Sequence, residues 1–261
     1  MLEARTGGDA GGGGTGRAGQ GGQPPAGAAK LPFLIIMHGE SSCPGRVGQA
    51  LRKRGHALDV RKPRFGCDLP ATLERHAGAV IFGGPMSAND PDDFIRKETD
   101  FIGVALKEEK PFLGVCLGAQ MLARHLGAKV EMHPGKLVEV GYYEVTPTTE
   151  GRTLGAWPGR FYQWHKEGFE LPTGSTRLAT GEIFENQAYA YGRAAAGLQF
   201  HPEITYALVR RWTVVADYMT NYLNAQPPAD HVEGHMLHSF HVTSWLDRFL
   251  DRLLAKTLVA A

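Results

Sequence analysis

A cysteine stands between two glycines in the segment Gly114-Val115-Cys116-Leu117-Gly118. The apolar residues before it predict a buried strand and those after it predict a helix, so the segment has the glycine–x–nucleophile–x–glycine form of a sharp strand-to-helix turn. In such a turn the thiol lies at a helix N-terminus, where the dipole and free N–H groups favour the thiolate. Cys116 is therefore a candidate nucleophile, although a thiol that only packs in a tight turn has the same local sequence.

A histidine and a glutamate supply the groups that a cysteine nucleophile needs, a base and a residue that orients the base. His201 and Glu203 follow an expected strand at residues 198–200, and ligand sites of open α/β sheets lie at such strand ends. Pro202 fixes the backbone between them, so Glu203 can accept the imidazole N–H and hold its tautomer. The His-x-Glu spacing also occurs in the signature of zinc deaminases, but that signature continues with a Pro-Cys-x-x-Cys segment, which is missing here.

A second glycine turn is expected after a strand at residues 79–82, in the segment Phe82-Gly83-Gly84-Pro85. Acyl chemistry at a thiol develops an oxyanion, which needs preorganised hydrogen-bond donors. The backbone amides of Gly84 and of Leu117, which follows the candidate nucleophile, are the natural pair of donors.

These segments together resemble the class I glutamine amidotransferases of the triad type, in order and spacing over residues 31–222. The matching segments are Phe82-Gly83-Gly84-Pro85, Gly114-Val115-Cys116-Leu117-Gly118-Ala119-Gln120 and Gln199-Phe200-His201-Pro202-Glu203. Within that family, Glu139-Val140-Gly141-Tyr142 and Asn186-Gln187-Ala188 are most similar to the stand-alone, GMP synthase-like members.

The resemblance implies a role for each matching residue. Cys116 would attack the side-chain amide of glutamine, His201 would shuttle the proton, and Glu203 would orient His201. The Gly84 and Leu117 amides would hold the oxyanion, and water would hydrolyse the resulting glutamyl thioester. The resemblance also places the following residues at the substrate: Gly83, Pro85, Gln120, His165 and Glu167. The histidines His235, His238 and His241 diverge around the last expected helix, and no nucleotide-binding glycine motif follows the first strand, so we expect no metal and no cofactor.

One segment departs from the family, which often has His-Trp-His-Gly-Asp where this chain has Gln163-Trp164-His165-Lys166-Glu167. Segments near this point help the family to bind the far end of glutamine. Three hypotheses therefore stay open. The chain is a glutaminase that supplies ammonia to a separate synthase, a self-sufficient hydrolase of γ-glutamyl peptides or amides, or a regulatory protein with a silent triad.

The elements that must position these residues alternate between strand and helix in the first half of the chain. Leu31 to Met37 is a continuous apolar run, as expected for a parallel strand buried on both faces. Further strands are expected at 56–60, 79–82 and 111–116, and helices at 45–55, 92–110 and 117–126. This alternation predicts a flavodoxin-like α/β fold with an open, mostly parallel sheet and flanking helices.

The second half of the chain has a different pattern. Short β segments separated by Gly and Pro predict a small antiparallel portion, followed by a helix at 204–224. A last amphipathic helix is expected from about Gly234 to Leu258, either docked on its own domain or forming a face for a second copy or another partner. We therefore expect a domain at 31–225 and a linker with a C-terminal helix at 226–261.

Composition limits the remaining classes of function. Residues 1–30 hold eleven of the 34 glycines, so we expect a disordered tail there. A net charge of +1 argues against nucleic acid as a partner. No apolar run is long enough for a membrane helix, and three widely spaced cysteines fit neither a disulfide scaffold nor a zinc site. We expect a soluble, cytoplasmic protein that acts on a small molecule.

Overall fold

The structure is a computed structural model and describes residues 30–259. Its strands are β1 (Lys30–Ile36), β2 (His56–Arg61), β3 (Gly78–Ile81), β4 (Phe112–Val115), β5 (Val130–Met132), β6 (Glu139–Glu144), β7 (Thr146–Pro147), β8 (Arg160–His165), β9 (Glu167–Phe169), β10 (Ser175–Thr180), β11 (Ala188–Tyr191) and β12 (Ala195–Leu198). Its α-helices are α1 (Gly45–Lys53), α2 (Asp93–Lys107), α3 (Leu117–His125), α4 (Thr149–Arg152), α5 (Tyr206–Val215) and α6 (Pro228–Leu254), with 3₁₀ turns η1 (Pro63–Phe65) and η2 (Asp217–Asn221). The predicted tail, residues 1–30, lies outside the described residues except for Lys30.

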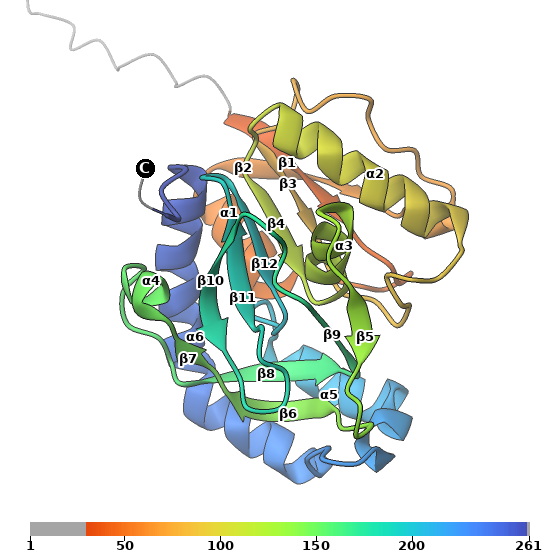
Figure 1. Cartoon of the computed structure of the whole chain (residues 1–261), viewed down its shortest axis with the longest axis vertical. Coiled ribbons are helices and arrows are strands. Elements are labelled where there is room, and N and C mark those ends of the chain that lie inside the picture. Colours follow the sequence, from red (N-terminus) through yellow and green to blue (C-terminus); the bar gives the residue numbers. More distant parts are fainter. Residues whose placement is uncertain (1–29, 260–261) are drawn as a thin grey trace, which may run out of the picture.

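One eight-stranded sheet organises the molecule, in the order β2-β1-β3-β4-β12-β11-β10-β7 (Figure 1). The five strands from β2 to β12 are parallel, and β11, β10 and β7 continue the sheet in antiparallel fashion. Two antiparallel pairs, β5–β9 and β6–β8, stand outside this sheet. The predicted α/β fold with a mostly parallel sheet and a small antiparallel portion is confirmed.

Helices cover both faces of the sheet, which explains why the first strand is apolar throughout. Phe33 and Ile35 of β1 point into a core shared with α1 and α6, whereas Leu34 and Ile36 point into a second core shared with α2 and α3. Successive side chains of a strand point to opposite faces, so a strand buried on both faces has no polar positions.

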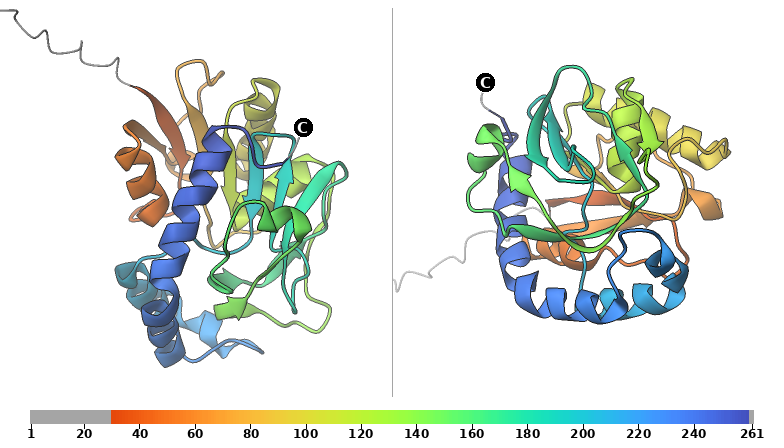
Figure 2. Two further views of the ribbon diagram at one scale, coloured as in Figure 1. Left: turned by 90° about the vertical axis from the view of Figure 1, so that its left-hand side faces the viewer. Right: turned by 60° about the horizontal axis from the view of Figure 1, so that its bottom comes forward.

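The C-terminal helix α6 is part of the core of the domain. Val242, Trp245, Leu246 and Phe249 are buried against Phe161, Phe200 and the sheet. Figure 2 shows α6 beside α5 at one end and extending along the molecule from there. The docked arrangement, one of the two that the sequence left open, is the one in this structure.

The last two helices differ in extent from their predicted ranges. The helix α5 ends at Val215, and the 3₁₀ turn η2 then lets Met219 pack against Val138 and Val140. The helix α6 begins at Pro228 rather than near Gly234, which lies inside it where a Cβ atom would meet the ring of Tyr142 at 2.4 Å. Among residues 30–259, no helix is long and apolar enough to cross a membrane.

Candidate active site

Cys116 occupies the turn between β4 and α3 with a strained backbone, φ 51° and ψ −107°. The left-handed region is costly for a residue with a side chain, and such strain clusters at functional sites. Both flanking positions require glycine, because a side chain at either would clash with a backbone carbonyl oxygen. A Cβ atom on Gly114 would lie 2.4 Å from the carbonyl oxygen of Gly118, and one on Gly118 would lie 2.1 Å from that of Ile81. The predicted turn is present, with the thiol at the N-terminus of α3.

His201 reaches the same place from the neighbouring parallel strand. Val115 of β4 is in register with Leu198 of β12, and the Cys116 amide donates to the Leu198 carbonyl at 2.7 Å. Both chains leave the sheet at its carboxyl edge, where the ligand sites of open α/β sheets lie. His201 Nδ1 lies 2.8 Å from Glu203 Oε1, and both residues are 3% exposed.

The start of α1 holds the loop that carries Glu203. The Arg46 amide donates to the Glu203 carbonyl at 2.9 Å. Gly45 has φ 49°, and a Cβ atom there would lie 2.0 Å from the same carbonyl oxygen. Only glycine allows this close approach, so the position of Glu203 depends on an element distant in sequence.

The glycine turn after β3 lies against both Cys116 and His201. A Cβ atom built on Gly83 would lie 3.0 Å from His201 Cε1 and 3.7 Å from Cys116 Sγ. Cys116 and His201 therefore lie side by side beneath Gly83. His201 Nε2 is buried and has no hydrogen-bond partner among residues 30–259. This nitrogen is the one ring position free to exchange a proton.

The protonated form of His201 is stabilised by its neighbours. Burial alone would lower its pKa, but the negative charges of Glu203 and of the Cys116 thiolate outweigh this and raise the pKa to about 10. A histidine with a raised pKa beside a thiol favours the thiolate–imidazolium pair, which is the reactive form of a cysteine nucleophile.

A cavity of about 360 Å³ opens over these residues. The lining includes Gly83, Gly84, Pro85, Cys116, Gln120, His165, Glu167, His201 and Glu203. Leu117 does not line it, but its amide is the first of α3 and has no intrahelical acceptor. The structure therefore brings all ten predicted site residues to one cavity or to its immediate edge. A further part of the wall comes from α5 and η2 and includes Trp212, Val215 and Met219.

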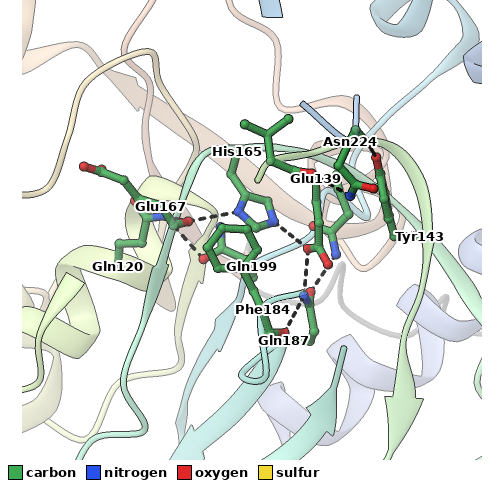
Figure 3. A network of polar contacts seen from close by, with 11 residues as sticks. Gln120, Glu139, Tyr143, His165, Glu167, Phe184, Gln187, Gln199 and Asn224 are labelled. Atoms are coloured by element: carbon green, nitrogen blue, oxygen red, sulfur yellow. Dashed lines mark hydrogen bonds and ion pairs between the residues drawn. The ribbon is translucent and has the colours of Figure 1, made fainter. Parts of the chain in front are cut away.

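A buried polar network connects three lining residues, Gln120, His165 and Glu167, to groups behind the wall of the cavity (Figure 3). Gln120 Nε2 and His165 Nδ1 both donate to the carbonyl of Glu167, each at 2.9 Å. His165 Nε2 lies 2.9 Å from Glu139 Oε2, which also accepts from Gln187 Nε2 at 2.9 Å. The two nitrogens of His165 are thus engaged by protein groups, and its ring fixes the Glu167 segment.

Sequence reasoning missed several of the residues that build this site. Glu139 and Gln187 served only as marks of the resemblance, and His38 and Glu98 were not noticed. His38 directly follows the first buried strand, a position that meets the carboxyl edge of the sheet. That placement was the available signal for His38, while Glu98 is an acidic residue inside a helix with nothing to mark it.

Other histidines and cysteines have different surroundings. His235 of α6 lies 3.2 Å from the Tyr142 hydroxyl and 3.4 Å from Arg46 Nη2. Within the described ranges, no group of three or more His, Cys, Asp or Glu residues is arranged to hold a metal ion. Cys43 is exposed and lines the cavity, and Cys67 is exposed elsewhere.

Comparison with known proteins gives a consistent result. The family model "Glutamine amidotransferase class-I" matches residues 40–209. The chain is 29% identical over 182 residues to the glutamine amidotransferase-like protein YfeJ of Salmonella typhimurium, covering 66% of this chain and 75% of that protein. It is 37% identical over 138 residues to a subunit of the glutamine-hydrolysing GMP synthase of Methanoregula boonei, covering 51% of this chain and 69% of that protein.

Solved structures and longer relatives extend this comparison. A glutamine amidotransferase from Thermotoga maritima superposes with a TM-score of 0.78 at 32% identity, over 86% of this chain and 98% of that chain. The chain also matches the glutamine-hydrolysing GMP synthase of Neisseria gonorrhoeae at 30% identity, over 58% of this chain but only 28% of that protein. The chain belongs to the class-I glutamine amidotransferase family.

Proposed function

We propose that this protein hydrolyses the side-chain amide of glutamine through Cys116, His201 and Glu203 and supplies the ammonia to a separate synthase. The observation that carries the proposal is the placement of the strained Cys116 beside the buried His201. One ring nitrogen of His201 has no partner among the described residues, and the other is held by Glu203. Membership of the family supports glutamine as the substrate.

The residues have defined tasks in this reaction. His201 Nε2 takes the thiol proton, and the Cys116 thiolate attacks the amide carbon of the glutamine side chain. The Gly84 and Leu117 amides stabilise the oxyanion, and the imidazolium then protonates the departing ammonia. Water, deprotonated by His201 Nε2, attacks the glutamyl thioester, and glutamate leaves as the thiol is restored.

Substrate positioning falls to the other predicted residues. Gly83 and Pro85 form the wall beside Cys116, and Gln120 and Glu167 form the opposite one. The side-chain N–H of Gln120 donates to the Glu167 carbonyl. The side-chain oxygen of Gln120 then serves as an acceptor for a substrate N–H group. His165 contributes indirectly, because its ring holds the segment that carries Glu167.

A synthase partner is proposed from the relatives. The M. boonei relative is named as one part of a larger GMP synthase, and this chain spans 28% of the N. gonorrhoeae GMP synthase. A homodimer stays an alternative use of the exposed surfaces. The three free cysteines suit a reducing compartment, so we place the protein in the cytoplasm.

The test is release of ammonia and glutamate by purified protein offered glutamine. The Cys116→Ala variant should lose all detectable release, and the Cys43→Ala variant, which removes the other thiol of the cavity, should lose at most a few-fold. Equal release by wild type and Cys116→Ala would refute the proposal.

A second candidate function is hydrolysis of a γ-glutamyl amide or peptide by this chain alone. The cavity continues beyond Cys116 along the apolar wall of Trp212, Val215 and Met219, which free glutamine has no group to fill. Under this alternative, γ-glutamyl amides with an apolar substituent on nitrogen would be hydrolysed faster than glutamine. Trp212→Ala would then raise the KM for those amides and leave the KM for glutamine unchanged.

A further inference from the structure

A third histidine–glutamate pair lies against the glycine turn after β3, outside the lining of the cavity. His38 follows β1, and Glu98 lies on α2, the helix that covers the adjacent face of the sheet (Figure 1). His38 Nε2 lies 2.7 Å from Glu98 Oε2, and both residues are completely buried. The residues of this pair do not line the cavity.

The other nitrogen of His38 binds the turn itself. His38 Nδ1 lies 3.1 Å from the carbonyl oxygen of Gly83. A carbonyl oxygen only accepts, so Nδ1 carries a proton and donates it. Glu98 accounts for the second nitrogen, either as a carboxylate that accepts from Nε2 or as a carboxylic acid that donates to it. In both cases the proton stays on Nδ1.

This contact fixes the direction of one peptide group. In a trans peptide the carbonyl of residue 83 and the N–H of residue 84 point in opposite directions. With the Gly83 carbonyl held toward His38, the Gly84 N–H points away from it. The turn lies between the two sites: a Cβ atom on Gly84 would touch His38 at 2.8 Å, and one on Gly83 would lie 3.3 Å from Cys116 Cβ. The Gly84 N–H is therefore directed to the side of Cys116.

We infer that His38 and Glu98 form a positioning pair, which holds the Gly83–Gly84 peptide with its N–H aimed at the oxyanion that forms over Cys116. The inference rests on the proposed function, since an oxyanion develops only if Cys116 carries out acyl transfer. It adds two residues to the machinery that touch neither substrate nor thiol.

Stability alone gives a poor account of this pair. Glu98 Oε1 is buried without a hydrogen-bond partner among the described residues. Replacing a buried ion pair by apolar residues of similar size is often neutral or stabilising. A buried pair with this cost is better explained by the group that it orients, which here is the Gly83 carbonyl.

The test compares three variants. The double variant His38→Leu/Glu98→Met fills the space and removes the donor. His38→Asn keeps a donor where Nδ1 stands. His76→Ala serves as the control. It removes another buried histidine, whose Nε2 lies 3.1 Å from Asp59 Oδ2, and neither residue of that pair lines the cavity. Each is assayed with glutamine and with γ-glutamyl p-nitroanilide, and Cys116 alkylation by iodoacetamide is timed in parallel.

The double variant should lower kcat about 10- to 100-fold with little change in KM, because an oxyanion-hole donor acts in the transition state. Its alkylation rate should stay within about twofold of wild type, because alkylation develops no oxyanion. His38→Asn should recover most of kcat, and His76→Ala should match wild type. An equal fall in hydrolysis and alkylation, or no fall in kcat, would overturn the positioning role.

Failure of the proposed function is distinguished from failure of this inference. If the wild type hydrolyses neither substrate, the function fails, and crystal structures of wild type and the double variant decide the inference. The Gly83 carbonyl should point toward His38 in the wild type and adopt another direction in the variant. An unchanged peptide in the variant would overturn the inference.

Discussion

Two histidine–glutamate pairs contribute side chains to the wall of the cavity, and their rings differ in how many nitrogens are free of protein partners. His201 and Glu203 are joined at 2.8 Å, and His165 and Glu139 at 2.9 Å, all almost completely buried. His201 has one nitrogen without a partner within the described structure, and Cys116 lies beside its ring. His165 has both nitrogens bound, one by Glu139 and one by the Glu167 carbonyl.

The difference shows that a buried histidine–carboxylate pair is not in itself a catalytic group. A base must exchange its proton with a reacting atom, so it needs a free nitrogen within reach of that atom. A histidine with two bound nitrogens can only orient its neighbours. By this criterion we propose His201 as the base and His165 as a residue that holds the Glu167 segment in the wall of the cavity.

The largest expected effect comes from removing each histidine in turn. His201→Ala should lower kcat for glutamine about 10⁴-fold or more, because nucleophile and base act as a unit. His165→Gln should leave Cys116 reactive toward iodoacetamide and act mainly through stability, lowering the free energy of unfolding by about 3 kcal/mol. Equal losses of kcat in the two variants would contradict the different roles assigned to His201 and His165. Hydrolysis, alkylation and denaturant unfolding are measured on both.

A smaller effect is expected from Glu203→Gln, which removes the largest cause of the raised His201 pKa. With Glu203 present the pKa is about 10, so His201 stays protonated at neutral pH, and NMR titration of its ring should show this. The variant should titrate at lower pH and lose about 10²-fold in kcat. A titration curve that is the same with and without the Glu203 carboxylate would contradict this assignment.

The raised pKa of His201 also makes the stability of the folded protein depend on pH. The pKa of His201 in the folded protein lies above the usual value of about 6.5. Its contribution to the free energy of unfolding is therefore fully present below about pH 6.5. The contribution declines as the pH rises and is lost as the pH passes through about 10. The difference in the free energy of unfolding between wild type and Glu203→Gln should therefore be largest below about pH 6.5 and should shrink as the pH rises toward about 10.

The smallest effect is expected from Glu139→Gln. The amide can still accept from Gln187 Nε2 and from His165, so the network is weakened rather than broken. The KM for glutamine should rise about two- to tenfold while kcat changes little, because only uniform binding is affected. A large fall in kcat with KM unchanged would show that this network acts on the transition state.

The sequence predicted what local patterns determine. The apolar run at 31–37 predicted a strand buried on both faces, and Phe33 to Ile36 of β1 are buried in this way. The glycines around Cys116 predicted a sharp turn because they leave no room for side chains there. His201 and Glu203 are two residues apart, so one short motif carries both.

The sequence did not reveal features that depend on packing between distant segments. The His38–Glu98 pair exists only because α2 packs over the end of β1. The predicted start of the last helix, near Gly234, was wrong: α6 begins at Pro228, and Gly234 lies inside it where Tyr142 packs against the helix. Likewise, α5 ends earlier than predicted because the chain turns at η2, where Met219 packs against Val138 and Val140.

The most direct test of the central claim is the mass of the protein quenched in acid during turnover of glutamine. We expect a transient adduct of one glutamyl group on the peptide that contains Cys116, and no adduct in the Cys116→Ala variant. His201→Ala should form it much more slowly. Release of glutamate at the wild-type rate with no adduct, or with an adduct on Cys43, would contradict the assignment of Cys116 as the nucleophile.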